Sequence, residues 1–163
     1  MDNGGQAVGE EPMQAVLEQA EQVAVQAEPK AAGAKFGFYW GTGRRKTAVA
    51  RVRIKPGSGA FEVNGKPVDK FFSEMRDRNS ATEALKVTEQ MGKWDVFANV
   101  HGGGFHGQAD AIKLGLARAL KLANAEFEQV LRDHGLLSRD ERKKERKKFG
   151  RRGARRGFQF SKR

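Results

Sequence analysis

Two absences narrow the chemistry of this chain before any motif is considered. The 163 residues include no cysteine, which excludes disulfides and thiolate metal sites and fits a reducing compartment. No apolar run approaches the roughly 20 residues that a membrane span requires. The first residues are acidic and lack the charged, then apolar, order of a signal peptide. The expectation is therefore a cytoplasmic protein with no membrane partner.

Basic charge, in contrast, is plentiful and unevenly distributed. The chain holds 31 Lys or Arg against 20 Asp or Glu, a net charge of +11, and its pI is about 10.2. Residues 139–163 alone hold 13 Lys or Arg and three acids, a net charge of +10. An excess of this size predicts a polyanionic partner.

The C-terminal segment 139–163 has the composition of an RNA-binding arm. Its cations are interleaved with phenylalanine and glycine, and it has no apolar periodicity that could form a core. Phosphates neutralise such a chain, and Phe rings or Arg planes stack on unpaired bases. Without RNA we expect the segment to be disordered. The alternatives to RNA binding are a tail that is only solvated or a targeting signal. The predicted RNA-binding side chains are Lys143, Lys144, Arg146, Lys147, Lys148, Arg151, Arg152, Arg155 and Arg156.

Composition divides the chain into three segments. Residues 1–37 form an acidic extension, residues 38–138 a globular domain and residues 139–163 the basic tail. Residues 1–29 carry six acids and no base, which favours disorder over the alternative, a transient amphipathic helix. The central segment of about 100 residues is long enough for one modest core.

Periodicity in the central segment predicts an α+β fold. Alternating residues indicate strands over 47–55, 60–65 and 94–100. Helices are expected from Pro67 over 67–75, over 81–90, over 108–123 and over 126–135. Ser80 is the expected N-cap of the second helix, with Glu83 completing a capping box. Strands and helices do not alternate regularly, so we expect a small mixed sheet with helices packed on one face.

A second group of cations precedes and lines the first strand. Gly41 and Gly43 would let the backbone approach a phosphate closely, but the stretch lacks the spacing of a nucleotide-binding phosphate loop. The alternation in 47–55 instead predicts one apolar and one cationic strand face. The predicted RNA-binding stripe consists of Arg44, Arg45, Lys46, Arg51 and Arg53.

A glycine-rich turn, GGGFHG over 102–107, follows an expected strand and opens an expected helix. That context matches the GxGxxG turn of dinucleotide-binding proteins, so a nucleotide-binding enzyme is one alternative function. The chain beyond it, however, lacks the further strands of a doubly wound sheet. The amides of the turn would equally suit an RNA phosphate. The glycines expected near RNA are Gly102, Gly103, Gly104 and Gly107.

No pattern in the sequence nominates a catalytic residue, a cofactor or a metal. HGGG at 101–104 resembles an oxyanion-hole string, but the partner GxSxG elbow is missing. His101, His106 and His134 lack the spacing and carboxylate support of a metal site. We therefore expect a non-enzymatic protein without cofactors.

Three strings in one chain carry a family resemblance. GTGRRKTAVARV, HGGGFHGQADAIKLGLARALK and the ending KKFGRRGARRGFQFSKR occur in this order between about residues 39 and 163. Together they closely resemble the family of the bacterial ninth small-subunit ribosomal protein. The acidic residues 1–35 depart from the compact pattern of that family.

The resemblance implies a fold, a location and partners. The fold would be similar to the second domain of the fifth small-subunit ribosomal protein, with a left-handed βαβ crossover. The partners would be the rRNA of the small-subunit head, neighbouring head proteins and the P-site tRNA. Tail residues Ser161, Lys162 and Arg163 would lie at the tRNA, while the stripe and the other tail cations would bind rRNA. A free RNA chaperone remains a further alternative.

Overall fold

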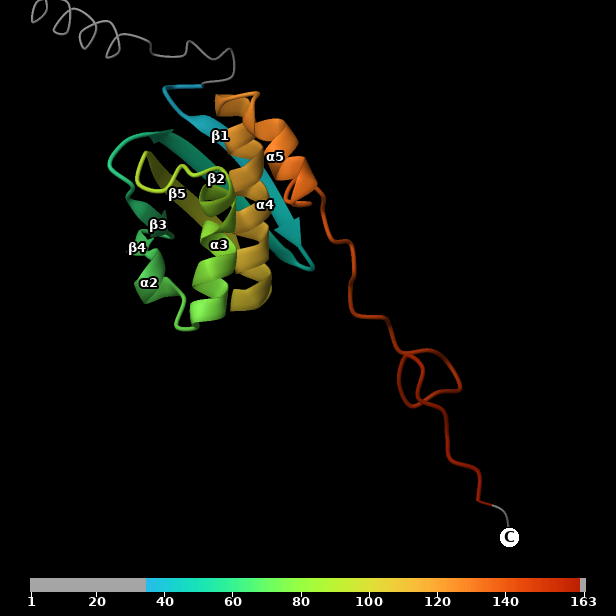
Figure 1. Ribbon diagram of the computed structural model, residues 1–163. Helices are drawn as coiled ribbons and strands as arrows, with labels where there is room; N and C mark the ends of the chain where they lie inside the picture. The colour runs from blue at the N-terminus through green and yellow to red at the C-terminus, as the bar shows by residue number, and fades with distance from the viewer. Residues whose placement is uncertain (1–34, 162–163) are drawn as a thin grey trace, which may run out of the picture. The chain divides into compact units, whose positions relative to one another are not determined.

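The computed structural model describes residues 35–161 (Figure 1). Within them, secondary structure runs from Tyr39 to Asp133. The strands are β1 (Tyr39–Arg45), β2 (Ala48–Pro56), β3 (Phe61–Val63), β4 (Lys66–Pro67) and β5 (Trp94–His101). The helices are α2 (Val68–Phe71), α3 (Met75–Val87), α4 (Phe105–Ala123) and α5 (Phe127–Asp133). No helix among these residues is long and apolar enough to cross a membrane.

The strands form one mixed sheet in the order β1-β2-β5-β3-β4. Three neighbouring pairs are antiparallel, whereas β3 and β5 are parallel. Parallel neighbours need a crossover connection, and here the chain between them carries β4, α2 and α3. The expected α+β class and mixed sheet are thus confirmed, while the left hand of the crossover stays a prediction.

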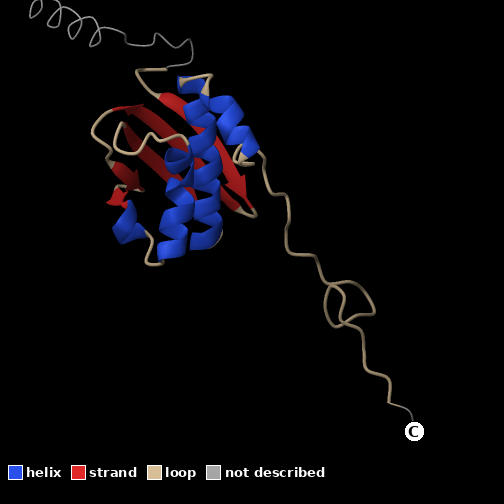
Figure 2. Cartoon of the chain, in the orientation of Figure 1, coloured by secondary structure: helices blue, strands red, loops and turns tan. Residues whose placement is uncertain are grey.

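Helices α3, α4 and α5 lie on one side of the sheet, as expected (Figure 2). Helix α4 packs mainly on β1 and β2, and α3 packs beside α4. The alternation predicted for β2 is confirmed, because Ala48, Ala50, Val52 and Ile54 are all buried. Each large aliphatic side chain buried in such a layer contributes roughly 1.5–3 kcal/mol. The largest fully buried side chains are Phe72, Ile54, Ile112, Leu116, Leu120, Leu131, Val52, Val63 and Val96.

Strand β1 was missed from the sequence, and its glycines have a different role from the one expected. Gly41 and Gly43 are buried against α4 rather than open to a phosphate. A Cβ on Gly41 would overlap the carbonyl oxygen of Gly115, and one on Gly43 would overlap that of Ala111. These glycines therefore let α4 lie close to β1, a contact that side chains would prevent.

The helices between β4 and β5 begin and end differently from the prediction. Helix α2 covers only four residues, and α3 begins at Met75 instead of 81. Ser80 is therefore not an N-cap; it lies within α3, and its hydroxyl donates to Asp110 Oδ1 at 3.0 Å. Arg78 explains the break between the helices, because its guanidinium donates to the carbonyls of Phe72 at 2.6 Å and Ser73 at 3.1 Å.

The predictions for the C-terminal half are closer. Strand β5 extends the predicted 94–100 by one residue, and α4 begins three residues before the predicted 108. Gly135 ends the helical stretch with a φ of 67°, and the amide of Leu136 donates to the carbonyl of Leu131. That is the glycine-ended C-cap expected there. No helix or strand follows between residues 136 and 161.

Candidate nucleic-acid interface

The predicted stripe of cations is divided by the alternation of β1. Neighbouring strand residues point to opposite faces, so Arg44 lies on the uncovered face and Arg45 on the helix side. Register pairs Arg44 with Val49 and Thr42 with Arg51, which puts Arg44, Arg51 and Arg53 on one face. Lys46 lies in the tight turn between the strands and is exposed. Four of the five predicted cations are thus available to a ligand, and Arg45 is engaged within the protein.

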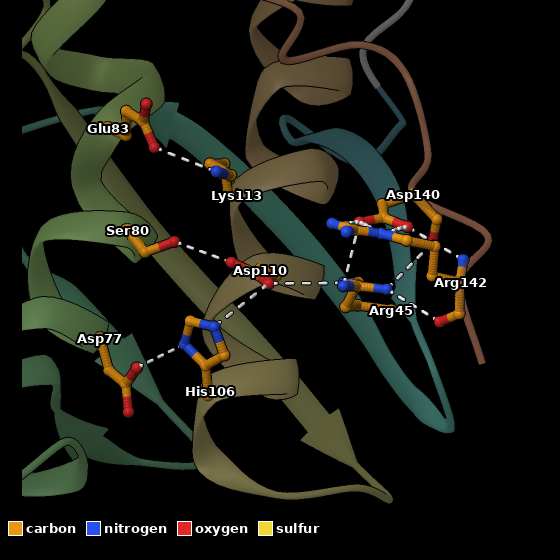
Figure 3. A network of polar contacts seen from close by, with 9 residues as sticks. All are labelled: Arg45, Asp77, Ser80, Glu83, His106, Asp110, Lys113, Asp140 and Arg142. Carbon is orange, nitrogen blue, oxygen red and sulfur yellow. Dashed lines mark hydrogen bonds and ion pairs between the residues drawn. The ribbon is translucent and has the colours of Figure 1, made fainter. Parts of the chain in front are cut away.

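Arg45 joins β1 to α4 and to the start of the tail (Figure 3). Its Nη2 lies 3.0 Å from Asp140 Oδ2, and its Nε lies 3.5 Å from Asp110 Oδ2. Its Nη1 donates to the carbonyl of Arg142 at 3.0 Å. The side chain of Arg45 is only 13% exposed. Because a largely buried cation with two carboxylate partners is held in place, Arg45 fixes where the tail begins.

The network continues from Asp110 to α3 (Figure 3). Asp110 accepts from Ser80, and its Oδ2 lies 3.9 Å from His106 Nε2. His106 Nδ1 in turn lies 3.0 Å from Asp77 Oδ1. The contacts connect α3, α4, β1 and the first tail residues, so the tail starts from a braced position.

Charge pairing is strong at the first tail residues. Arg142 donates through Nε and Nη2 to both oxygens of Asp140. These bonds, with smaller help from Arg45, hold the pKa of the Asp140 carboxyl far below its usual range. Arg45, Lys46, Arg142, Lys143 and Lys144 also line one shallow hollow beside this point. Such a concave cluster of cations suits a phosphate group.

We call residues 140–142, which Arg45 holds, the root of the tail. Beyond this root, the cations of the tail are exposed to solvent. All nine predicted tail cations, Lys143 through Arg156, are exposed. Glu145 is paired with Lys148 and Arg155, and these partners lower the pKa of its carboxyl. The described part of the tail is mostly irregular chain, with a turn and bends over 149–155 where the amide of Arg152 donates to the carbonyl of Arg156. Ser161 is exposed, whereas Lys162 and Arg163 lie outside the described residues.

The glycine-rich turn packs on the β1–β2 turn, which divides its glycines into two kinds. Gly102 and Gly103 have φ values of 74° and 66°, in the left-handed region. A Cβ on Gly102 would lie 2.6 Å from the carbonyl oxygen of Thr47, and one on Gly103 would lie 3.1 Å from Ala48 Cβ. Gly104, by contrast, is extended and has nothing within 4 Å. Gly107 meets only ordinary contacts, so the fold itself requires Gly102 and Gly103.

The sheet around this turn differs from a dinucleotide-binding fold. Such a fold needs a parallel, doubly wound sheet, but β5 has antiparallel β2 on one side and short β3 on the other. After α4 the described chain adds α5 and no further strand. Within residues 35–161, no three His, Cys, Asp or Glu side chains gather as metal ligands would.

Sequence reasoning also missed an aromatic group on the uncovered face of the sheet. Phe38, Trp40 and Phe97 surround Arg53, and Trp40 also lies near Arg51. The sequence did contain a signal for a strand here, because Phe38 and Trp40 alternate with Tyr39 and Gly41, which are buried on the helix side. It was overlooked because β1 was not recognised as a strand.

Comparison with known proteins agrees with this geometry. Residues 43–163 match the model of the family described as ribosomal protein S9/S16. The chain is 52% identical over 121 residues to the small ribosomal subunit protein uS9 of Anaeromyxobacter sp. (strain K), a match that covers 74% of this chain and 93% of the relative. The protein of the same name from Anaeromyxobacter dehalogenans matches with the same identity and coverage. A match of this extent, which includes the turn before α4 and the whole basic tail, shows that the chain belongs to the ribosomal protein S9/S16 family.

Proposed function

We propose that this protein helps to build the head of the small ribosomal subunit and that its tail tip contacts the P-site tRNA. As a member of its family, the chain is a structural, RNA-binding component of the small subunit that serves translation in the cytoplasm. The finer parts of the proposal concern which residues bind rRNA, which partners lie beside them and what the tail tip does.

The tail carries the main argument for the rRNA contacts. Its nine exposed cations begin at a root that Arg45 braces, and the segment has no core to hold it together. Like charges in such a segment repel one another until phosphates neutralise them. The globular domain adds Arg44, Lys46, Arg51 and Arg53, and head proteins beside the rRNA complete its surroundings.

Each of the three segments of the chain is considered separately in this proposal. Residues 38–138 act as the domain that docks on folded rRNA, and residues 139–163 act as the arm that follows RNA. Residues 1–37 are the acidic extension, nearly all of which lies outside the described residues. The turn lies near RNA, and its glycines have no side chain that would keep RNA from the backbone. These glycines are Gly102, Gly103, Gly104 and Gly107.

Co-sedimentation tests the ribosomal assignment against a free RNA chaperone. The tagged full chain is sedimented with small subunits through a gradient at high salt. A ribosomal component stays with the subunits in stoichiometric amount, because it is embedded in rRNA. A chaperone held by charge alone is released, since salt screens exposed ionic contacts. Release of the protein would contradict the proposal.

A titration with nucleotides tests the non-enzymatic role. A nucleotide-binding enzyme would gain stability as its ligand saturates the site. We expect the melting temperature of the full chain to stay unchanged with nicotinamide and adenine nucleotides. Saturable stabilisation by any of them would favour the enzyme reading of the GxGxxG turn.

Removal of Lys162 and Arg163 tests the tRNA contact. Phosphate contacts position a ligand without reading its sequence, which suits a site that accepts every tRNA. We expect normal subunit assembly and a loss in P-site tRNA affinity of roughly 1–3 kcal/mol, the range for hydrogen bonds to charged groups. Filter binding of several tRNAs to the mutant subunits measures it. No loss, or a loss confined to one anticodon, would contradict the contact.

A further inference from the structure

The face of the sheet opposite the helices carries rings and cations in alternation. Register aligns Trp40 with Arg53, and Arg53 with Phe97. Side chains of registered partners share a face, so β1, β2 and β5 present these groups together. We call this surface the ring face; it consists of Phe38, Trp40, Thr42, Arg44, Arg51, Arg53, Phe97 and Asn99.

Arg53 is the centre of the ring face. Its Cζ lies 5.2 Å from the ring centroid of Phe38 and 5.4 Å from that of Phe97. The ring of Trp40 lies at 5.9 Å, and Arg51 approaches that same ring at 6.0 Å. Phe38 meets Phe97 edge-on, with centroids 6.2 Å apart. A guanidinium among three rings is held by cation–π attraction, so the rings are fixed in orientation while all of them stay half-exposed.

The cations of the ring face lack acidic partners. Among the described residues, Arg44, Arg51 and Arg53 take part in no ion pair. Lys55, at the border, lies 3.6 Å from Asp95. These three arginines therefore present positive charge without an ion-pair partner next to aromatic surface. Exposed Glu62 of β3, which is registered with Phe97, lies on the same face.

We propose that the ring face binds a segment of RNA with unpaired bases. Bases stack on Trp40 and Phe97, and Arg51 with Arg44 meets the phosphates that flank them. Exposed rings beside cations make a stacking platform that accepts any base, because every base has a π-face. Paired RNA keeps its base faces covered within the helix, so the ligand is single-stranded. The proposal rests on the proposed RNA-binding function and adds the kind of RNA that the domain takes.

Trp40 itself can report the stacking. The chain has two tryptophans, and Trp94 packs edge-on against buried Tyr39 with centroids 5.9 Å apart. A Trp94→Phe variant of the full chain leaves Trp40 as the single reporter. Oligoadenylate is expected to quench its fluorescence with saturation, whereas an RNA duplex of equal phosphate number quenches it little. An equal response to both RNAs would overturn the proposal.

Affinity provides the second measurement. The double variant Trp40→Leu/Phe97→Leu keeps apolar bulk but removes both rings, and Phe127→Leu on α5 is the matched control. Loss of each stacked base should weaken oligoadenylate binding roughly 5- to 150-fold, so the double variant should lose at least that much affinity. Duplex affinity and the control should change little. If the double variant misfolds by circular dichroism, the fluorescence measurement decides alone.

Failure of the ring face is distinguishable from failure of the proposed function. Unchanged oligoadenylate affinity in the double variant overturns the ring face, and loss of RNA binding on deletion of 139–163 would still support the tail. Quenching of Trp40 by polyglutamate but not by oligoadenylate would assign the face to an acidic protein partner and overturn the proposal. The proposal is supported if oligoadenylate quenches the Trp94→Phe variant with saturation and also binds the double variant more weakly.

Discussion

Gly103 illustrates at the scale of one residue how glycine serves the fold. Its φ of 66° is unfavourable for a residue with a side chain, and a Cβ would press on Ala48. The turn between β5 and α4 thus needs glycine for packing against the β1–β2 turn, whether or not RNA also approaches there.

A matched pair of substitutions tests this reading of the turn. Gly103→Ser should lower the free energy of unfolding by roughly 1–3 kcal/mol, the cost of a strained backbone conformation. Gly104→Ser should be neutral or slightly stabilising, because Gly104 is the extended N-cap of α4 and serine is favoured there. Urea denaturation measures both. Equal losses at the two positions would contradict the role of the left-handed conformation.

Arg45 shows how far neighbouring residues of one strand can differ. Arg45→Ala leaves Asp110 and Asp140 without their shared cation, so we expect a loss of about 1–3 kcal/mol in unfolding free energy. Arg44→Ala, one residue earlier on the exposed face, should stay within about 0.5 kcal/mol of the parent. Unfolding in urea compares the two variants, and similar effects would show that Arg45 does not brace the tail root.

At the scale of elements, Asp95 of β5 organises the loop between β2 and β3. Its Oδ1 accepts the amides of Ser58, Gly59 and Ala60 at 2.9, 3.1 and 3.1 Å. The bond from Ala60 is the largest cause that lowers the pKa of the Asp95 carboxyl. The charged form is therefore favoured in the folded state, and its contribution to stability is present above the ordinary Asp pKa.

This linkage predicts a specific pH dependence. Asp95→Asn should be less stable than the parent at neutral pH. The difference should shrink as the pH falls below about 4 towards the lowered pKa, because the parent then also loses its charge. Thermal unfolding at several pH values measures the difference, with exposed Glu62→Gln as the control. A difference that stays constant with pH would place the effect in packing rather than charge.

At the scale of the whole molecule, the division of charge between domain and tail decides how RNA is held. If the tail supplies most phosphate contacts, deletion of 139–163 should flatten the salt dependence of RNA binding. Loss of even five contacts changes the log–log slope by about 3.5 to 4.5. Filter binding over a range of salt concentrations measures the slope. An unchanged slope would place the electrostatic contacts on Arg44, Lys46, Arg51 and Arg53.

Much of the architecture was accessible from local patterns. The alternation of β2, the stretch 94–100, the apolar stripe of α4 and the glycine after α5 depend on short-range periodicity and turn chemistry, so they were predicted well. Helix α3 was placed too late because the Ser80 capping signal is local, whereas its hydroxyl is used by Asp110 across the interface with α4. β1 was missed because two of its three buried residues are glycines, Gly41 and Gly43, whose place in a strand only the packing of α4 explains.

The candidate interface, like the fold, has features that the sequence alone specifies and others that depend on the tertiary structure. Composition and order along the chain alone determined the basic arm, its interleaved aromatics and the family resemblance, because charge and motif need no neighbours to be recognised. The tertiary structure decided which cations are available. It turned Arg45 inward to Asp110 and Asp140 and gathered Phe38, Trp40 and Phe97 around Arg53. Strand pairing brings together residues that lie far apart in sequence, and no local pattern specifies which strands will be neighbours.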